Sequence, residues 1–251
     1  MNRRLRLAHA RPRQYLRITM NIRDKVVIVT GASEGIGKAL AEALSERGAK
    51  LVLVARSEDR LKAVAARLPG AVTLRADMRK AKDVEATIDA ALSAHGRVDI
   101  LVNNAGQGLY GPLESVDIEA YRSMMELNVY APLRAMQLVI PRMRKAGGGM
   151  IVNIGSMVSK NSFPFLGAYA SSKYALNAIT YTARAELARD GIVVSVFHPR
   201  MTATRFGENA IGARSSYPGA GAPRSSAVDS PEQVAAKVLE LIGSEAAEAS
   251  M

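Results

Sequence analysis

Two side chains that could move a proton stand four residues apart in the stretch AYASSKYAL, residues 168–176. Tyr169 and Lys173 are at positions i and i+4, which lie on one face of a helix. An ordinary tyrosine has a pKa of about 10 and is a weak acid–base group at neutral pH, but a nearby ammonium stabilises its tyrosinate form. The spacing therefore predicts that Lys173 assists Tyr169 as a general acid or base. Tyr174 lies about 100° further round such a helix, and we expect it to be a packing residue.

A glycine-rich turn, TGASEGIG at residues 30–37, offers a second kind of chemistry. It follows the β-branched run KVVIVT and opens a helical pattern, which is the context that a dinucleotide site requires. Glycine lets the backbone approach a pyrophosphate closely, and the helix N-terminus supplies free N–H donors with a partial positive charge. A plain turn between a strand and a helix is the alternative interpretation. The residues of this turn expected to contact a cofactor are Gly31, Ser33, Gly35, Ile36 and Gly37.

The end of the second apolar run, LVLVARSEDR at residues 51–60, indicates which dinucleotide would bind. A site that selects NAD normally places a carboxylate about 20 residues after the first glycine, at the end of this strand. Ala55 and Arg56 occupy that place, and the planar guanidinium of an arginine matches a 2′-phosphate. NADP(H) is therefore favoured over NAD(H). Glu58 and Asp59 follow closely and weaken the inference, and a solvated surface position is the alternative for Arg56.

These residues need a scaffold, and the chain from Lys25 onwards supplies one by alternating short apolar runs with amphipathic stretches. The expected strands are KVVIVT (25–30), KLVLVA (50–55), AVTLRA (71–76), VDILVN (98–103), GMIVNIG (149–155) and IVVSVFH (192–198). Continuous apolar runs of this length are typical of parallel strands covered on both faces. The pattern predicts a single doubly wound α/β domain over residues 20–251 with a mostly parallel sheet of six strands.

Composition excludes several classes of function. Hydrophobic residues make up 48% and charged residues 23% of the chain, as in a soluble globular protein. No uninterrupted apolar run reaches the length of about 18 residues that a membrane span needs. The chain has no cysteine, which rules out disulfides, zinc fingers and thiol catalysis and suits the cytoplasm, where we expect the protein. Three scattered histidines, His9, His95 and His198, offer no metal site.

The net charge of +11 is concentrated at the N-terminus, because residues 1–20 carry six arginines and no acidic residue. The leader has no apolar core of a secretory signal. We expect residues 1–19 to be a basic, disordered extension of the domain that begins at Met20. A transit peptide or a nucleic-acid-binding arm is the alternative for this segment. The rest of the chain does not interleave aromatic and basic residues as a nucleic-acid surface would, so no nucleic-acid partner is expected.

Taken in order, TGASEGIG (30–37), NNAG (103–106), Asn128, Ser156 and YASSK (169–173) resemble the short-chain dehydrogenase/reductase family. The resemblance covers residues 25–242 and implies a Rossmann-type fold, a nicotinamide cofactor and a catalytic tetrad of Asn128, Ser156, Tyr169 and Lys173. Ser156 would donate a hydrogen bond to the substrate oxygen, and Asn128 would bend its helix and hold a water for a proton relay. Each of these residues, taken by itself, has an alternative structural role. Ser156 could cap the end of a strand, Asn128 could be an amide on a helix surface, and Tyr169 could be a half-buried core ring.

The same resemblance assigns further residues to the cofactor. Asp77 would contact the adenine, Lys173 the nicotinamide ribose and Thr204 the carboxamide. The implied cofactor residues outside the glycine turn are Arg56, Asp77, Met78, Asn104, Ala105, Gly106, Tyr169, Lys173, Pro199, Thr202 and Thr204.

The chain departs from the family pattern at two places. Arg200 replaces the glycine that usually follows Pro199, which puts the backbone beside the nicotinamide in question. Family members commonly end with a seventh strand, but the C-terminal GSEAAEASM has no strand signal, so the sheet could have six strands or seven. His198 is expected to be a packed strand residue and not a base.

A substrate pocket with an apolar lining is expected beside the tetrad, formed by Leu109, Met157, Phe163, Phe165, Leu166, Met201 and Phe206. Such a lining favours a lipophilic ketone, aldehyde or alcohol over a charged sugar, and residues 200–228 would form a substrate lid. We therefore expect an NADP(H)-dependent oxidoreductase that interconverts a carbonyl and an alcohol, as a homodimer or homotetramer. A catalytically idle NADP(H)-binding sensor or scaffold with the same fold is the alternative.

Overall fold

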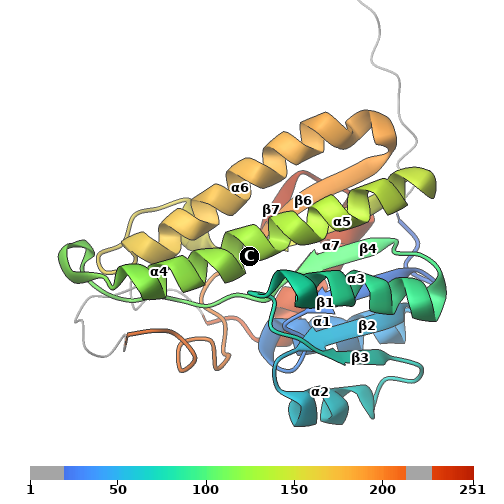
Figure 1. Ribbon diagram of the computed structural model, residues 1–251, viewed down its shortest axis with the longest axis horizontal. Coiled ribbons are helices and arrows are strands. Elements are labelled where there is room, and N and C mark those ends of the chain that lie inside the picture. The colour runs from blue at the N-terminus through green and yellow to red at the C-terminus, as the bar shows by residue number, and fades with distance from the viewer. Residues whose placement is uncertain (1–19, 213–227) are drawn as a thin grey trace, which may run out of the picture.

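The computed structural model describes residues 20–212 and 228–251. The leader at residues 1–19 and the middle of the expected lid, residues 213–227, lie outside the described residues, so the expectations for them stay predictions. The described chain forms one parallel sheet of seven strands in the order β3-β2-β1-β4-β5-β6-β7 (Figure 1). The strands are β1 Val26–Thr30, β2 Lys50–Ala55, β3 Val72–Arg75, β4 Ile100–Asn103, β5 Gly149–Ile154, β6 Ile192–His198 and β7 Glu248–Ser250.

Helices cover both faces of the sheet. They are α1 Gly35–Glu46, α2 Glu58–Ala65, α3 Ala81–His95, α4 Ile118–Met125, α5 Ala131–Lys145, α6 Gly167–Leu187 and α7 Pro231–Ser244. Helices α1, α2 and α7 pack on one face of the sheet, and α3, α5 and α6 pack on the other. Both faces of the central strands are thereby buried, which explains why those strands are runs of Val, Ile and Leu without polar alternation. This architecture confirms the predicted doubly wound Rossmann-type fold.

The strand order reverses between β1 and β4, which are neighbours in the sheet although they are far apart in the chain. Chain crossings leave the sheet in opposite directions at such a point and open a crevice beyond the carboxyl ends of the strands, where ligands bind in α/β proteins. The motifs singled out in the sequence follow the carboxyl ends of β1, β4, β5 and β6. The fold therefore gathers them at one edge of the sheet.

The C-terminal segment forms a seventh strand, although its sequence carries no strand signal. Strand β7 pairs in parallel with β6, with Val196 opposite Glu248 and His198 opposite Ser250. Polar and small residues suffice because the strand is only three residues long and lies at the edge, where a short polar strand is typical. Its position is fixed from outside the sheet, since the Glu248 carboxylate accepts a hydrogen bond of 2.7 Å from the Lys160 ammonium.

Helix α7 begins where the sequence signals predicted. The Ser230 hydroxyl accepts a hydrogen bond of 3.2 Å from the Gln233 main-chain N–H, and the Gln233 side chain accepts one of 2.8 Å from the Ser230 N–H. This reciprocal pair is a capping box, and Pro231 stands at the first turn. Within the part of the chain that the structure describes, no helix is both long and apolar enough to span a membrane.

Candidate active site

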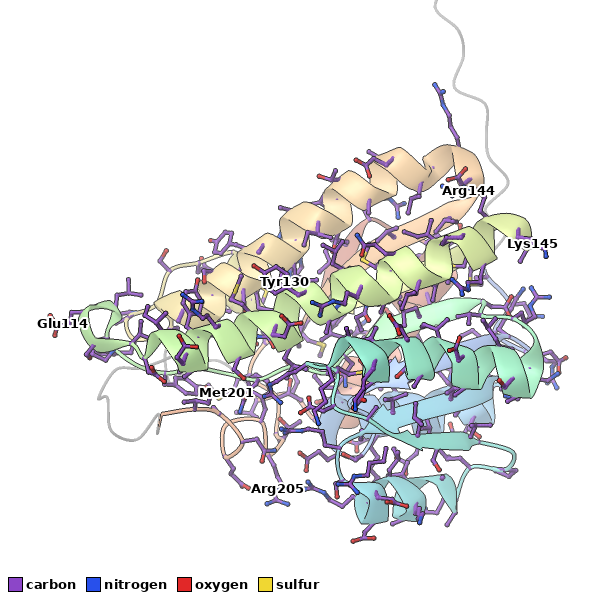
Figure 2. All side chains as sticks on the ribbon, viewed as in Figure 1. Glu114, Tyr130, Arg144, Lys145, Met201 and Arg205 are labelled. Carbon is purple, nitrogen blue, oxygen red and sulfur yellow. The ribbon has the colours of Figure 1, made fainter. Side chains whose placement is uncertain are left out.

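A cavity of about 630 Å³ opens at the carboxyl edge of the sheet. Met201 and Arg205, on the segment after β6, line this cavity. In Figure 2 they lie at the other end of the molecule from Arg144 and Lys145, at the end of α5. The expected site residues that line the cavity are Gly31, Ser33, Gly35, Ile36, Arg56, Asp77, Met78, Asn104, Ala105, Gly106, Ser156, Tyr169, Lys173, Pro199, Thr202 and Thr204. The two expected site residues outside the lining are Gly37 and Asn128, which lie behind its wall.

The glycine turn packs so tightly that its glycines have no room for a side chain. Gly31 has a φ of +66°, in the left-handed region that favours glycine. A Cβ on Gly37 would lie 2.3 Å from the Gly31 carbonyl oxygen and 2.5 Å from the Asn104 amide nitrogen. The absence of a side chain therefore lets helix α1 begin directly against β1 and β4. The first turn of α1 contains no acidic residue, so its free N–H groups face the cavity edge without a competing carboxylate on that turn.

Tyr169 and Lys173 lie on one face of α6, as their spacing predicted. Both are buried, with 8% and 4% of their surface exposed, and both reach the cavity. The Lys173 ammonium donates a hydrogen bond of 2.8 Å to the Ile154 carbonyl oxygen at the end of β5. It lies 6.0 Å from the centroid of the Tyr169 ring. Ser156, two residues beyond β5, lines the same cavity and lowers the pKa of Tyr169 to some extent.

Burial shifts the pKa values of both residues of this pair. Burial raises the pKa of Tyr169, and the hydrogen bond with Ser156 offsets this only in part. Burial also lowers the pKa of Lys173 to about 8. Lys173 is not among the groups that shift the pKa of Tyr169 in the protein alone, so the expected lowering of that pKa by its ammonium stays a prediction. The raised pKa keeps the Tyr169 hydroxyl protonated at neutral pH.

Asn128 lies in a π-helical turn, Glu126–Tyr130 (η2), that interrupts the long helix between α4 and α5. Its amide forms a reciprocal pair with the Gln107 main chain, accepting from the N–H at 2.9 Å and donating to the carbonyl at 2.9 Å. It also donates to the Ser172 hydroxyl at 3.0 Å. Asn128 is 1% exposed, so the helix-surface alternative is wrong. The water relay stays a prediction, and the side chain is already occupied by three protein hydrogen bonds.

Two arginines line the end of the cavity that follows β2. Arg56 and Arg60 line it, and Arg60 donates a hydrogen bond of 2.9 Å to the Glu34 carboxylate in the glycine turn. Among the described residues, Arg56 forms no hydrogen bond or ion pair, so its guanidinium is free to meet a ligand. The pairing of Glu34 with Arg60 was not expected from the sequence, because the two stand 26 positions apart.

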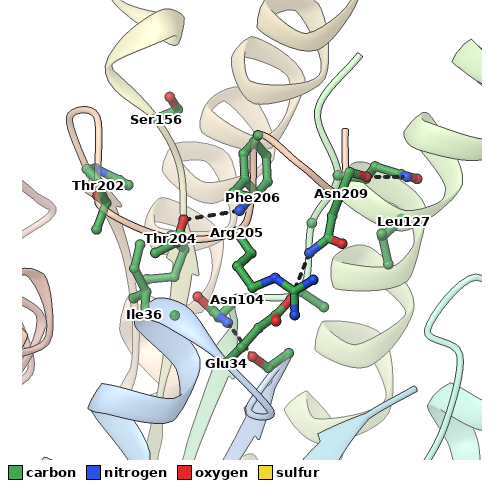
Figure 3. Close-up of a pocket in the computed structure, with 18 of the residues that line it drawn as sticks. Glu34, Ile36, Asn104, Leu127, Ser156, Thr202, Thr204, Arg205, Phe206 and Asn209 are labelled. Carbon is green, nitrogen blue, oxygen red and sulfur yellow. Dashed lines mark hydrogen bonds between the residues drawn. The ribbon is translucent and has the colours of Figure 1, made fainter. Parts of the chain in front are cut away.

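The described part of the expected lid spans the cavity. Asn209 donates a hydrogen bond of 2.8 Å to the Glu34 carboxylate, drawn as a dashed line in Figure 3. The Gln107 side chain donates one of 2.9 Å to the Asn209 carbonyl oxygen from the opposite wall. Both residues were missed in the sequence, where nothing links Gln107 or Asn209 to the recognised motifs. Together they tie the segment after β6 to the turns after β1 and β4.

Arg200, which departs from the family pattern, has a structural partner at the other end of the lid. Its guanidinium donates two hydrogen bonds, of 3.1 and 2.8 Å, to the two carboxylate oxygens of Asp229. Main-chain bonds join the same two chain segments, from Ala203 N–H to the Asp229 carbonyl and from the Asp229 N–H to the Met201 carbonyl, both 2.9 Å. The arginine therefore closes the base of the segment that leads into and out of the lid.

The apolar lining is partly as predicted. The expected residues that line the cavity are Met157, Phe163, Leu166, Met201 and Phe206. Leu109 and Phe165 do not line it, so the prediction is wrong for them: Leu109 is 3% exposed and packs into the core cluster beneath Tyr169, and Phe165 has a φ of +63° that directs the turn before α6. Tyr174 is 47% exposed and is not the packing residue expected.

Comparison with known proteins agrees with this arrangement. Residues 25–214 match the short chain dehydrogenase family. An uncharacterized oxidoreductase of Staphylococcus epidermidis is 35% identical over 184 residues, which are 73% of this chain and 80% of the relative. The alcohol dehydrogenase of the archaeon Thermococcus sibiricus, complexed with 5-hydroxy-NADP, superposes with a TM-score of 0.79 at 30% identity, covering 90% of this chain and 95% of that one.

A second solved structure is similar to the same extent. The 3-ketoacyl-(acyl-carrier-protein) reductase of Brucella melitensis, complexed with NADH, superposes with a TM-score of 0.82 at 28% identity, covering 92% of this chain and 97% of that one. The chain belongs to the short-chain dehydrogenase family, as the sequence motifs indicated. It is an oxidoreductase of the dehydrogenase/reductase kind.

Proposed function

We propose that the protein is an NADP(H)-dependent reductase of lipophilic ketones or aldehydes, with Tyr169 as the proton donor. One observation carries the proposal: a protonated tyrosine, its serine partner and a buried lysine share a cavity wall, and a glycine turn and a free arginine lie at the other end. The tyrosine, serine and lysine are the groups that carbonyl reduction needs. The glycine turn and the arginine suit a phosphorylated dinucleotide.

The residues at the cavity fit a nicotinamide dinucleotide. No side chain caps the N-terminus of α1, so its first main-chain N–H groups are free for a pyrophosphate. Asp77 and Met78 would border the adenine, Asn104 to Gly106 the adjoining ribose and phosphates, and Thr204 the carboxamide. A reduced nicotinamide supplies a hydride to the carbonyl carbon.

Tyr169 completes the reduction by giving its phenolic proton to the carbonyl oxygen as that oxygen gains negative charge. Ser156 would donate a hydrogen bond to the same oxygen and stabilise the charge as it develops. Lys173 stands next to the resulting tyrosinate, and its ammonium stabilises that anion until a proton returns from solvent. Lys173 has no carboxylate partner in the described structure, so its charge is available for this role.

Arg56 supports NADP(H) as the preferred cofactor. The similar structures do not decide the matter, since one is complexed with an NADP derivative and the other with NADH. In this chain the end of β2 carries no carboxylate that could accept the two ribose hydroxyls of NADH, and Arg56 stands directly after Ala55. A 2′-phosphate would give Arg56 a charged partner, whereas a 2′-hydroxyl would leave it without one.

The substrate end of the cavity supports a lipophilic carbonyl compound. Phe206 packs against the Tyr169 ring with 5.6 Å between centroids, and Phe163 and Leu166 lie in the same wall. Arg200, which also lines the cavity, is already paired with Asp229, so an apolar substrate group would not leave that guanidinium without a partner.

The test is a screen of ketones and aldehydes that follows the absorbance of NADPH or NADH. We expect turnover of aromatic or long-chain carbonyl compounds with NADPH, and weaker turnover with NADH. Equal or better use of NADH would refute the cofactor preference. Tight NADPH binding without turnover of any carbonyl compound would refute the reductase function and favour a cofactor-binding sensor.

A further inference from the structure

Glu34 brings a carboxylate into the end of the cavity that follows β2. It directly precedes α1 and lines the cavity together with Arg56 and Arg60. In a dinucleotide site, a carboxylate at the end of the second strand normally accepts hydrogen bonds from the adenosine ribose. Strand β2 ends without such an acid, but β1 pairs with β2, so Glu34 supplies a negative charge from the neighbouring strand. The proposed reaction gives this carboxylate no role.

Both carboxylate oxygens of Glu34 are held by hydrogen bonds. The Arg60 guanidinium donates to one oxygen at 2.9 Å. The Asn209 amide donates to the other at 2.8 Å (Figure 3). Asn209 is itself fixed, because its main-chain carbonyl oxygen accepts a hydrogen bond of 2.9 Å from the Gln107 side chain. The Glu34 side chain does not cap α1, and its contacts hold it beside Arg60 instead.

We propose that Glu34 is a specificity-determining residue whose carboxylate competes with the 2′-phosphate of the cofactor for the Arg60 guanidinium. This role rests on the proposed preference for NADP(H). In the free protein Arg60 pairs with Glu34 across the end of the cavity. When a phosphorylated cofactor binds, Arg60 leaves the carboxylate and joins Arg56 on the phosphate. A cofactor with a 2′-hydroxyl leaves the pair between Arg60 and Glu34 intact.

Arg60 can exchange one anion for the other at a small cost in free energy. Glu34 is its one ionic partner among the described residues, and 46% of the Arg60 side chain is exposed. An ion pair that is open to water to this extent contributes little to stability. A phosphate group carries more negative charge than a carboxylate, and its oxygens match the planar fork of a guanidinium. The phosphate is therefore the stronger partner for Arg60.

The two arginines differ in what they give up when a phosphate binds. Arg56 has no hydrogen bond or ion pair to break, whereas Arg60 has to leave Glu34. The bound phosphate then has the Glu34 carboxylate as a neighbour of like charge, which also weakens binding. Glu34 thus lowers the affinity for a 2′-phosphate below the value that two unpaired arginines would give.

A first test measures nucleotide binding and needs no turnover. Adenosine 2′,5′-bisphosphate and adenosine 5′-phosphate differ only in the 2′-phosphate, and isothermal titration calorimetry gives the Kd of each. We expect Arg60→Gln to weaken binding of the bisphosphate by about 10-fold. Glu34→Gln should strengthen it by about 2-fold to 5-fold, because Arg60 is then unpaired. Both variants should bind adenosine 5′-phosphate as the wild type does.

Glu42→Gln is the matched control for Glu34→Gln. Glu42 lies on α1, pairs with Arg67 at 3.5 Å and does not line the cavity. Its replacement removes the same charge and should leave both Kd values unchanged. An equal gain in bisphosphate affinity from Glu42→Gln would overturn the proposal, because net charge alone would explain it. Weaker binding of adenosine 5′-phosphate by Glu34→Gln would also overturn it, since the carboxylate would then bind the ribose.

A second test follows the Arg60 guanidinium itself by ¹H–¹⁵N NMR, with its Nε–H resonance assigned by its loss in Arg60→Gln. The resonance should move in Glu34→Gln without ligand, and in the wild type on addition of adenosine 2′,5′-bisphosphate. Adenosine 5′-phosphate should leave it in place. A resonance that the bisphosphate does not move would overturn the proposal.

The two nucleotides also separate this proposal from the proposed function. A wild type that prefers the bisphosphate, with the same preference in Arg60→Gln, would keep the proposed NADP(H) preference and overturn the role of Glu34 and Arg60. A wild type that binds both nucleotides equally would refute the NADP(H) preference and this proposal with it. Failure to reduce any carbonyl compound would refute the reductase function, and the Kd values would still decide whether Glu34 competes for Arg60.

Discussion

Lys173 directs its ammonium to the Ile154 carbonyl oxygen, 2.8 Å away, and stands 6.0 Å from the centroid of the Tyr169 ring. The lysine is thus anchored to the end of β5 beside the tyrosine, and no carboxylate among the described residues pairs with it. Burial without an acidic partner lowers the pKa of Lys173 to about 8. An ammonium held in this way costs stability at neutral pH, which is typical of a group kept for function.

The cost of burying Lys173 should be visible in the pH dependence of stability. Between pH 8 and 10.5 the unfolded chain binds more protons at this lysine than the folded chain does. The unfolding free energy of the wild type should therefore rise relative to Lys173→Met, by up to about 3 kcal/mol over this range. Urea unfolding at successive pH values measures the difference. A difference that stays constant from pH 7 to 10 would contradict the burial of a charged lysine.

Replacing Gly37 tests the fit of the glycine turn. Gly37→Ala places a Cβ 2.3 Å from the Gly31 carbonyl oxygen, so the turn must open and α1 must shift. We expect a loss of about 1–3 kcal/mol in stability and of detectable NADPH binding, followed by nucleotide fluorescence. Gly243→Ala in α7 is the matched control, because its Cβ meets nothing within 4 Å. It should gain up to about 1 kcal/mol and bind NADPH normally; similar behaviour of both variants would refute the account of the turn.

Arg56→Gln tests the choice between the two cofactors. Hydrogen bonds to charged groups contribute about 1.5–3 kcal/mol, so the Kd for NADPH should rise by about 10-fold to 100-fold. The Kd for NADH should stay the same, because it has no 2′-phosphate. Arg67→Gln is the control, since Arg67 is exposed, pairs with Glu42 and does not line the cavity. Equal losses of NADPH and NADH affinity would mean that Arg56 does not read the phosphate.

The Arg200–Asp229 pair should hold the base of the lid. Asp229 is buried, so Arg200→Gln leaves its carboxylate without a cation. Because Arg200 is itself 39% exposed, we expect a loss of about 1–3 kcal/mol, below that of a fully buried pair. Asp229→Asn in the same chain should recover part of the loss. A double-mutant cycle by urea unfolding measures the coupling, and a coupling energy near zero would refute the role of the pair.

Five of the six longer strands could be predicted from the sequence because each is an apolar run buried on both faces, and burial determines their composition. Strand β3 at the edge is only half-buried, and its run AVTLRA is correspondingly less apolar. Strand β7 could not. It is held by contacts of Glu248 with Lys160 and Tyr181, which are far away in the chain. The prediction that Tyr174 is a packing residue was wrong for a similar reason. Helical spacing defines the faces of a helix but does not indicate which face the rest of the chain covers.

In the candidate site, too, features set by local sequence could be predicted and contacts between distant residues could not. Spacing on one helix placed Tyr169 and Lys173 together, and order along the chain placed Ser156 and the glycine turn at one edge of the sheet. The contacts that set their electrostatics could not be predicted, because they are made with main-chain atoms such as the Ile154 carbonyl. Gln107 and Asn209 belong to no recognisable motif, and the fold alone brings them together across the cavity.

Turnover by Tyr169→Phe tests the central claim most directly. Phenylalanine keeps the ring that packs on Phe206 and removes only the hydroxyl, so folding and NADPH binding should remain as in the wild type. Loss of the proton donor should lower kcat for carbonyl reduction by about 10²-fold to 10⁴-fold. We predict this loss at an unchanged Kd for NADPH and an unchanged Tm. A kcat equal to that of the wild type would contradict the assignment of Tyr169 as the proton donor.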